Sequence, residues 1–143
     1  MSASEDIAAL IPHQGAMCLL ERVVEWDAGH AILATTTHRA ISNPLRSGGR
    51  LRAVHLCEYG AQAMAIHGGL SARAAGQTAR PGFLASLREV ALNTNFVDTL
   101  AGELIVTVHQ LLRSEAAWQY AFEVWHEDRL LASGRAAIMA QPR

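Results

Sequence analysis

Apolar and polar residues alternate along several short segments in the second half of the chain. The clearest segment is residues 117–126, where every second position carries a large side chain: Trp118, Tyr120, Phe122, Val124 and His126. A period of two places such positions on one face of a β-strand. Weaker alternation over residues 83–92, 103–112 and 130–140, between segments rich in turn-forming residues, predicts three more strands.

The first half of the chain has a different pattern. Two mostly apolar segments, 17–26 and 30–38, predict a pair of strands joined by a tight turn. A capping pattern that begins at Ser2 predicts a short helix near the N-terminus. The alanine-rich segment 52–67 is long enough for about four helical turns, and Gly68–Gly69 are expected to end this helix with a left-handed cap.

The expected order is a short helix, two strands, one long helix and four strands, in a single domain that spans residues 1–143. Only one long helix is available to cover a sheet of about six strands. An antiparallel sheet that wraps around this helix is the most economical way to bury both elements. The sequence therefore predicts an α+β fold of this kind.

Composition narrows the functional classes. Half of the 143 residues are hydrophobic and 17% are charged, which is typical of a globular protein. The formal net charge of -1 gives no support for nucleic-acid binding. The first residues are acidic and contain no long apolar run, and Cys18 and Cys57 lie in apolar segments that favour free thiols. We therefore expect a cytoplasmic protein with no signal peptide and no membrane span.

Three polar residues stand out in the predicted long helix. His55, Glu58 and Gln62 lie three and four positions apart, which places them on one narrow stripe of the helix. An imidazole and a carboxylate are costly to bury unless they are paired or used, and together they are suited to proton transfer near neutral pH. The structural alternatives are a core histidine that orients Glu58, a buried carboxylate, and an amide that only packs.

Over nearly its whole length the sequence resembles the β-hydroxyacyl-acyl-carrier-protein dehydratases of fatty acid synthesis. Residues 11–26, with their Pro-His and Glu-Arg-Val, are similar to that family's N-terminal segment, and residues 58–62 are similar to its Glu-x-x-x-Gln motif. The runs 58–69 and 81–88 are similar, more specifically, to the dehydratase-like proteins of aryl polyene clusters. The resemblance implies a hotdog fold, in which an antiparallel sheet wraps around one long central helix.

The resemblance also implies an activity: dehydration of a 3-hydroxyacyl thioester on an acyl carrier protein to the trans-2-enoyl product, in aryl polyene or fatty acid biosynthesis. The glutamate of the motif is catalytic in that family, so Glu58 is the expected general acid. The family's catalytic histidine lies in a loop ahead of the helix, where the corresponding residue here is Pro44, and no histidine occupies the loop. His55, one helical turn before Glu58, is the substitute expected to act as the base.

Four other residues are candidates for substrate binding. In the resembled family, backbone N–H groups at the helix start polarise the thioester carbonyl, and Gly48–Gly49 precede the helix here, where glycines let a substrate approach closely. Gln62 is expected to hold Glu58 in place. His13 is a candidate donor at the edge of the site, with a hydrogen bond to nearby backbone as the alternative.

Three arginines form a basic cluster just before the long helix: Arg46, Arg50 and Arg52. They are suited to an acidic carrier protein or to the phosphate of its pantetheine arm, whereas a solvated loop is the alternative. Positive charge at a helix start opposes the helix dipole, which favours a role in binding anions. Because two sheets join edge to edge in the resembled family, we also expect a homodimer, or a heteromer with another hotdog protein.

The remaining histidines are expected to have structural roles. His67 is expected near the end of the long helix, where it would interact with the dipole. Four others are expected at surface or edge positions: His30, His38, His109 and His126. Because the histidines and cysteines show no metal-ligand spacing, no metal site is expected, and the resemblance implies no cofactor.

Two other functions fit the same residues. A hotdog acyl thioesterase would use Glu58 as a nucleophile or to activate water. A non-catalytic hotdog subunit that pairs with an active dehydratase would explain why the loop histidine is missing. Enoyl formation from a 3-hydroxyacyl carrier substrate separates the dehydratase from both alternatives.

Overall fold

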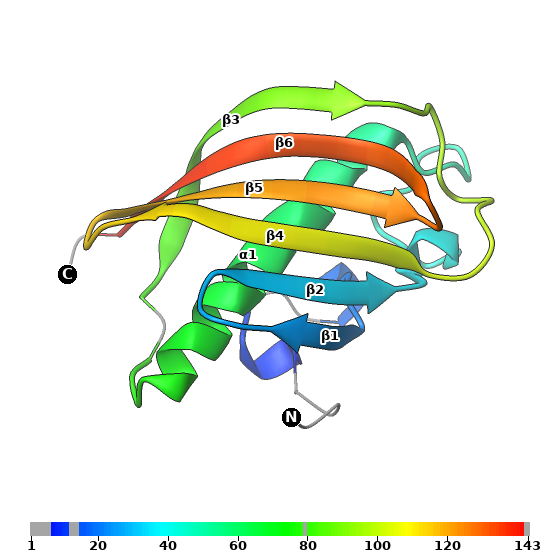
Figure 1. Ribbon diagram of the computed structural model, residues 1–143. Helices are drawn as coiled ribbons and strands as arrows, with labels where there is room; N and C mark the ends of the chain where they lie inside the picture. Colours follow the sequence, from blue (N-terminus) through cyan, green and yellow to red (C-terminus); the bar gives the residue numbers. More distant parts are fainter. Residues whose placement is uncertain (1–6, 12–14, 79, 142–143) are drawn as a thin grey trace.

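A computed structural model describes residues 7–11, 15–78 and 80–141 (Figure 1). The strands are β1 (Arg22–Trp26), β2 (His30–Thr35), β3 (Gly82–Leu92), β4 (Leu104–Arg113), β5 (Ala117–His126) and β6 (Arg129–Ala140). The long helix is α1 (Leu56–Ala74), and the short 3-10 helices are η1 (Ile7–Ala9), η2 (Gly15–Met17), η3 (Thr37–Arg39) and η4 (Ala53–His55).

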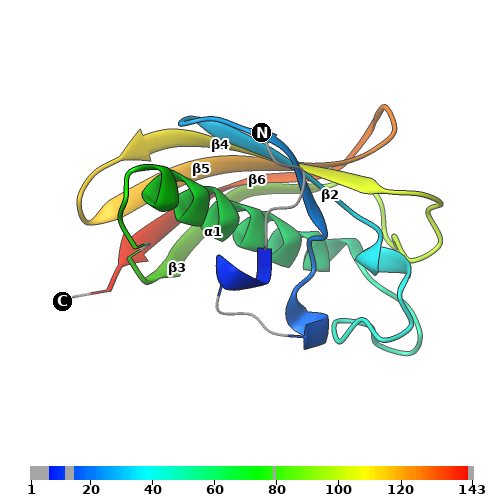
Figure 2. The same ribbon diagram turned by 90° about the horizontal axis from the view of Figure 1, so that it is seen from below.

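The six strands form one antiparallel sheet in the order β1-β2-β4-β5-β6-β3. The sheet curves over α1, and η1 lies on the side of the helix that faces away from the sheet (Figure 2). This arrangement confirms the predicted antiparallel sheet around one long helix. No helix in the described ranges is long and apolar enough to cross a membrane.

The core lies between α1 and the inner face of the sheet. The buried apolar side chains of the helix are Leu56, Tyr59, Ala63, Met64, Ile66 and Leu70. The alternation predicted for β5 is confirmed, because Tyr120, Phe122 and Val124 are all buried. The Phe122 ring fits between two glycines, Gly60 on α1 and Gly134 on β6, and a Cβ atom at either would lie 2.7 Å from a ring carbon. Both positions therefore require the absence of a side chain.

The predicted end of the long helix at Gly68–Gly69 is wrong. The helix continues to Ala74, and Gly76, at φ 72°, follows it in the left-handed conformation. The amide of Gln77 closes the end by donating to the Ala72 carbonyl at 2.8 Å. Glycine at position 69 has a packing role instead, since a Cβ there would lie 3.1 Å from the Leu10 side chain.

Two other boundaries differ from the prediction. The first strand begins only at Arg22, because residues 15–17 form η2 and are held near α1 by a side chain described below. The predicted long helix is not α-helical before Leu56: Arg52 is extended and residues 53–55 form a 3-10 turn. The predicted start of the N-terminal helix at Ser2 lies outside the described residues.

Candidate active site

Gln62 is the best-anchored polar residue of the predicted stripe. Its side chain is completely buried. Its Oε1 accepts a hydrogen bond from the Leu19 amide at 2.9 Å, and its Nε2 donates to the Met17 carbonyl at 2.7 Å. The same Nε2 donates to Oε2 of Glu58 at 3.2 Å. Gln62 therefore ties the segment before β1 to the helix and orients Glu58 at the same time.

Glu58 lies in the first turn of α1 and is half-buried. The hydrogen bond from Gln62, one turn further along the helix, points one carboxylate oxygen of Glu58 along the helix surface. The half-buried face of α1 beyond Glu58 carries only small side chains at Ala61, Ala65 and Gly68. The Glu58 carboxylate is therefore partly accessible at the head of a face made of small residues.

His55 is the last residue of η4 and occupies the N-cap position of α1, where it is half-buried. Its backbone amide donates to the Arg52 carbonyl at 3.1 Å. Within the described part of the chain, no hydrogen bond or ion pair joins the side chains of His55 and Glu58. The two residues therefore share one end of the helix without a direct polar link between their side chains.

Gly48 and Gly49 form a tight two-residue turn ahead of η4. Both have positive φ, 59° and 75°, which explains why glycine occupies both positions. The flanking residues close the turn with two backbone hydrogen bonds: Ser47 donates to Arg50 at 2.9 Å, and Arg50 donates to Ser47 at 3.1 Å. Apart from each glycine and its chain neighbours, no atom of a described residue lies within 4 Å of the position that a Cβ would take at Gly48 or Gly49, so the turn borders open space.

The three arginines of the basic cluster differ in the hydrogen-bond partners of their guanidinium groups. Arg46 supports the loop, because its Nη atoms donate to the carbonyls of Gly49 at 2.9 Å and His38 at 3.3 Å. Arg50 donates from Nε to both carboxylate oxygens of Asp98 at 3.0 and 3.2 Å. Arg52 is exposed and makes no such bond to a described residue.

Phe96 links two of these arginines. The guanidinium of Arg50 lies 4.0 Å from the Phe96 ring centre and that of Arg52 lies 5.2 Å from it. Burial acts to raise the pKa of Asp98, but hydrogen bonds from the Leu51 amide and from Arg50 outweigh it, so the pKa is lowered. Asp98 therefore stays ionised and holds Arg50 close to the helix start.

A buried network that the sequence did not reveal joins the loop to the helix. The Tyr59 hydroxyl receives a hydrogen bond from Nδ2 of Asn43 at 3.0 Å and lies 2.9 Å from the Thr37 hydroxyl. Asn43 also donates to the Thr37 carbonyl at 2.9 Å. Burial raises the pKa of Tyr59, which keeps the phenol protonated. The network fixes the loop that contains Pro44, where the resembled family carries its histidine.

The expectation that His38 lies at a surface or edge is wrong. The chain leaves β2 at Thr35 and turns inward through η3, so that His38 is completely buried. Its Nε2 lies 2.8 Å from the Leu100 carbonyl and donates to it. Burial lowers the pKa of His38, which keeps the ring neutral.

His67 is also placed differently from its prediction. It lies inside α1 rather than at its end and is completely buried. Its Nε2 donates to the Asp27 carbonyl at 2.8 Å, and its Nδ1 therefore accepts from the Tyr120 hydroxyl at 2.8 Å. Burial lowers the pKa of His67 and raises that of Tyr120 to about 12. The pair joins the β1–β2 turn, α1 and β5.

His13, a predicted substrate-binding residue, lies outside the described residues. Among the residues that are described, no group of three or more histidine, cysteine, aspartate or glutamate side chains is placed to hold a metal ion.

A protein-family model described as ApeP dehydratase, of the ApeP-like group, matches residues 5–143. The chain belongs to the ApeP-like dehydratase family. The family assignment agrees with the resemblance found from residues 58–69 and 81–88. Among curated protein sequences, none shows a significant match.

Solved structures with the same fold include both dehydratases and thioesterases. A chain of the dehydratase heterocomplex ApeI:P from Xenorhabdus doucetiae superposes with a TM-score of 0.85 at 22% identity, covering 96% of this chain and 91% of that one. Zebra fish thioesterase superfamily member 2 gives 0.68 at 12% identity, covering 94% and 93%. AziG from S. sahachiroi gives 0.63 at 14% identity, covering 87% and 92%. At these identities the similarity shows the fold alone, which is the hotdog fold.

Proposed function

We propose that this protein dehydrates 3-hydroxyacyl thioesters carried by an acyl carrier protein, in aryl polyene biosynthesis, with Glu58 as the acid and His55 as the base. The supporting observation is the orientation of Glu58: a fully buried glutamine holds this half-buried residue by a 3.2 Å hydrogen bond at the start of the central helix. Membership in the ApeP-like dehydratase family supports the reaction class.

The reaction needs two proton transfers, one from the α-carbon and one to the hydroxyl on the neighbouring β-carbon. A base removes a proton from the α-carbon of the thioester, and an acid donates a proton to the β-hydroxyl, which leaves as water while the α,β double bond forms. The thioester oxygen gains negative charge and is stabilised by backbone N–H groups at the start of α1. The acid and the base must each reach the substrate, but they need not contact one another. The lack of a hydrogen bond between His55 and Glu58 is compatible with these separate roles.

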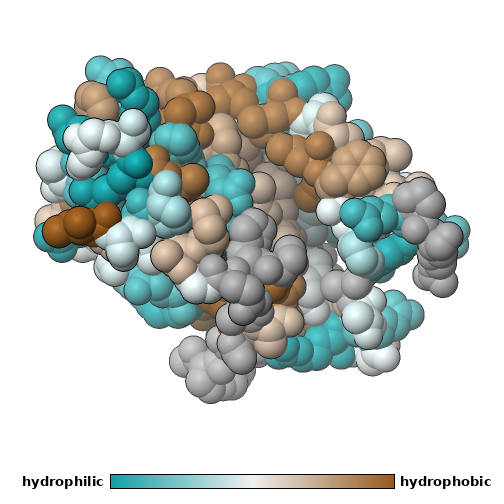
Figure 3. Space-filling view, turned by 180° about the vertical axis from the view of Figure 1, so that it is seen from behind, coloured by the Kyte–Doolittle hydropathy of each residue, from teal (hydrophilic) through white to brown (hydrophobic). Residues whose placement is uncertain are grey.

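A second part of the proposal concerns the edge strand β3, which we expect to pair with another hotdog chain. All of its large apolar side chains are strongly exposed: Phe83 (51%), Leu84 (49%), Leu87 (38%), Val90 (40%) and Leu92 (41%). A band of hydrophobic surface follows this edge of the molecule (Figure 3). An exposed apolar edge strand is a template for pairing with a further strand.

Two kinds of partner fit this edge: a second copy of this chain or a different hotdog chain. A homodimer would join β3 to β3 of a second copy, whereas the ApeI:P structure is by its description a heterocomplex of dehydratases. Size-exclusion chromatography with light scattering distinguishes the two for this protein. A homodimer that persists when a second hotdog chain from the same source is co-expressed would argue against the heteromer, and a persistent monomer in both preparations would exclude both.

The carrier protein is expected to dock near the start of α1. Arg52 is exposed beside Phe96, and Val54, at 49% exposure, adds an apolar contact two residues further on. An acidic carrier, or the phosphate of its pantetheine arm, fits this combination of positive and apolar groups. Arg46 contributes indirectly, since its guanidinium supports the Gly48–Gly49 turn.

The test is an assay of the full chain, alone and with its co-purified partner, on a 3-hydroxyacyl carrier substrate. Formation of the enoyl product is followed by mass spectrometry of the carrier. We expect wild-type protein to form it and Glu58→Gln to lose it while keeping its thermal unfolding temperature. Full activity of both Glu58→Gln and His55→Ala, or no product from either wild-type preparation, would refute the assignment.

A non-catalytic subunit is the second candidate, and one observation favours it. The loop before the helix lacks a histidine, and within the described residues no hydrogen bond or ion pair joins His55 to Glu58 in its place. This candidate predicts that the mixed complex retains its activity when Glu58 of this chain is changed to glutamine. The dehydratase proposal predicts that the same complex loses activity.

A further inference from the structure

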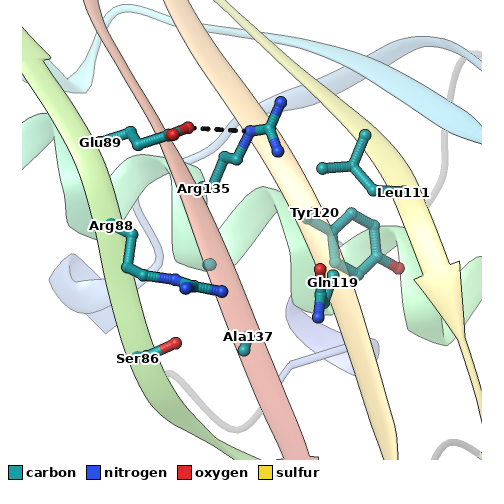
Figure 4. Close-up of a pocket in the computed structure, with 9 residues that line it drawn as sticks. Ser86, Arg88, Glu89, Leu111, Gln119, Tyr120, Arg135 and Ala137 are labelled. Atoms are coloured by element: carbon teal, nitrogen blue, oxygen red, sulfur yellow. Dashed lines mark ion pairs between the residues drawn. The ribbon is translucent and has the colours of Figure 1, made fainter.

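The outer face of the sheet, opposite α1, carries a hollow that the proposed reaction does not use. Its volume is about 140 Å³, and its lining includes Ser86, Arg88, Gln119, Arg135 and Ala137. Figure 4 shows the hollow with the strands in front and α1 behind them. Because the sheet separates it from Glu58 on the helix side, the hollow is distinct from the candidate active site.

Three irregularities in strand pairing surround this hollow. The pairing of β3 with β6 shifts between Leu84 and Ser86 and again between Arg88 and Ala91. The pairing of β4 with β5 shifts around Leu111, which also lines the hollow. Such bulges change the direction of side chains and often lie beside functional sites. Here they aim residues from neighbouring strands at one place.

Like charges face each other across two strands at the hollow. Arg88 on β3 is directly opposite Arg135 on β6, an arrangement that disfavours strand pairing unless an anion compensates it. Glu89 supplies part of the compensation through an ion pair of 3.1 Å with Nε of Arg135. Glu89 adopts a left-handed conformation at φ 55° and turns toward Arg135. Two guanidinium groups and one carboxylate leave one positive charge at the hollow.

The remaining donors of the hollow have no partner among the described residues. Arg88 extends over β6 toward Ala137 without an ion pair or a hydrogen bond (Figure 4). The Ser86 hydroxyl and the Gln119 amide likewise have no hydrogen bond within the described ranges. Ala137 provides a floor with no side chain beyond Cβ, so space remains above it. Hydrogen-bond donors and unbalanced positive charge meet in one small space.

We propose that this hollow is a binding site for an oxyanion, a carboxylate or phosphate group, held by Arg88 with Ser86, Gln119 and the free side of the Arg135 guanidinium. A guanidinium binds either group through two parallel hydrogen bonds. Glu89 limits affinity, because it is a negative charge beside the ligand and it occupies one nitrogen of Arg135.

The first test titrates the full chain with inorganic phosphate and, separately, with acetate, while backbone amide signals are followed by NMR. We expect saturable shifts centred on Ser86, Arg88, Gln119 and Ala137, and the tighter of the two anions identifies the ligand chemistry. Equal shifts from sodium chloride at the same ionic strength, or shifts that are strongest elsewhere, would overturn the proposal.

The second test uses two pairs of variants. Arg88→Gln is expected to weaken binding at least roughly tenfold through loss of charge-assisted hydrogen bonds. Arg39→Gln, which removes the same charge from an exposed side chain at the end of η3, should leave binding unchanged. Glu89→Gln should tighten binding more than Glu127→Gln, a matched exposed glutamate that also has φ 55°. Equal effects within either pair would show that only net charge matters and would reject the site. Thermal unfolding of each variant confirms that it is folded.

Discussion

Gln62 and His67 lie five positions apart on the same helix, and both are completely buried polar side chains. Each joins α1 to a distant segment through hydrogen bonds: Gln62 to the backbone before β1, and His67 to the β1–β2 turn and to Tyr120. Only Gln62 has a further hydrogen bond, which it donates to the half-buried Glu58. A buried polar group that bonds only backbone and another buried side chain serves the fold, whereas one that also orients a partly accessible carboxylate marks a site.

The largest effect on activity is expected at Glu58, the residue that is bonded to Gln62 and has no counterpart beside His67 among the described residues. Glu58→Gln removes an acid that typically contributes a factor of about 10² to 10⁴ to a reaction rate, so enoyl formation should fall by at least about a hundredfold. The unfolding temperature should change little, since glutamine has the same shape and the residue is only half-buried. A variant that unfolds easily but retains its specific activity would place Glu58 with the structural residues instead.

His67→Phe should have the next largest effect, and on stability alone. It leaves the Asp27 carbonyl and the Tyr120 hydroxyl without their buried partner, at a cost of about 1–3 kcal/mol for each unsatisfied group. Urea unfolding measures this loss. At a temperature where the variant is folded, turnover should stay within about twofold of wild type, which corresponds to about 0.4 kcal/mol, because His67 bonds Asp27 and Tyr120 and not Glu58. A large drop in turnover would give His67 a role in the site.

Gln62→Leu should lower both activity and stability, the activity by less than Glu58→Gln does and the stability by less than His67→Phe does. The variant leaves the Leu19 amide and the Met17 carbonyl unpaired and removes the hydrogen bond from Gln62 to Glu58. We therefore expect about 2 kcal/mol of lost stability and a roughly tenfold fall in kcat. The pH–rate profile should also shift, because the hydrogen bond to Glu58 is lost. If kcat and its pH profile are those of wild type, Gln62 only packs.

The smallest effect is a dependence of stability on pH. Burial lowers the pKa of His67 in the folded state, while the unfolded residue titrates near about 6.5. The unfolded chain therefore binds more protons below that pH, so stability is full above about 6.5 and falls as the pH decreases, by at most about 1.4 kcal/mol per pH unit for this group. Urea unfolding of wild type and His67→Gln across this range should give a shallower slope for the variant. The lowered pKa of His38 contributes to the remaining slope in the same direction, whereas the raised pKa of His30 acts in the opposite direction. Parallel slopes would contradict this account.

The sequence predicted those features that depend on local periodicity. The positions of β5 and its buried face followed from alternation at residues 118–126, and the placement of Glu58 beside Gln62 followed from helical spacing. Spacing does not give side-chain direction, particularly at His55, which lies in a 3-10 turn rather than in the α-helix. The closeness of Glu58 to Gln62 was therefore within reach of sequence reasoning, whereas the lack of a bond between His55 and Glu58 was not.

Features that depend on distant contacts were missed or wrong. Gly68–Gly69 looked like a helix end because the sequence does not show that Leu10 packs closely against position 69. His38 looked exposed because its partner, the Leu100 carbonyl, lies 62 residues away. The partners of Gln62 lie 43 and 45 residues away. Polar residues in apolar segments reveal that a buried partner is needed, but only the fold identifies it.

Phe122 and its two flanking glycines have a consequence for how related sequences can diverge. Since a methyl group at Gly60 or at Gly134 would collide with the ring, a lineage that acquires alanine at either position should also carry a smaller residue at position 122. The three positions are expected to covary although they lie on a helix and two strands, and the double change Gly134→Ala with Phe122→Leu should be tolerated better than Gly134→Ala alone.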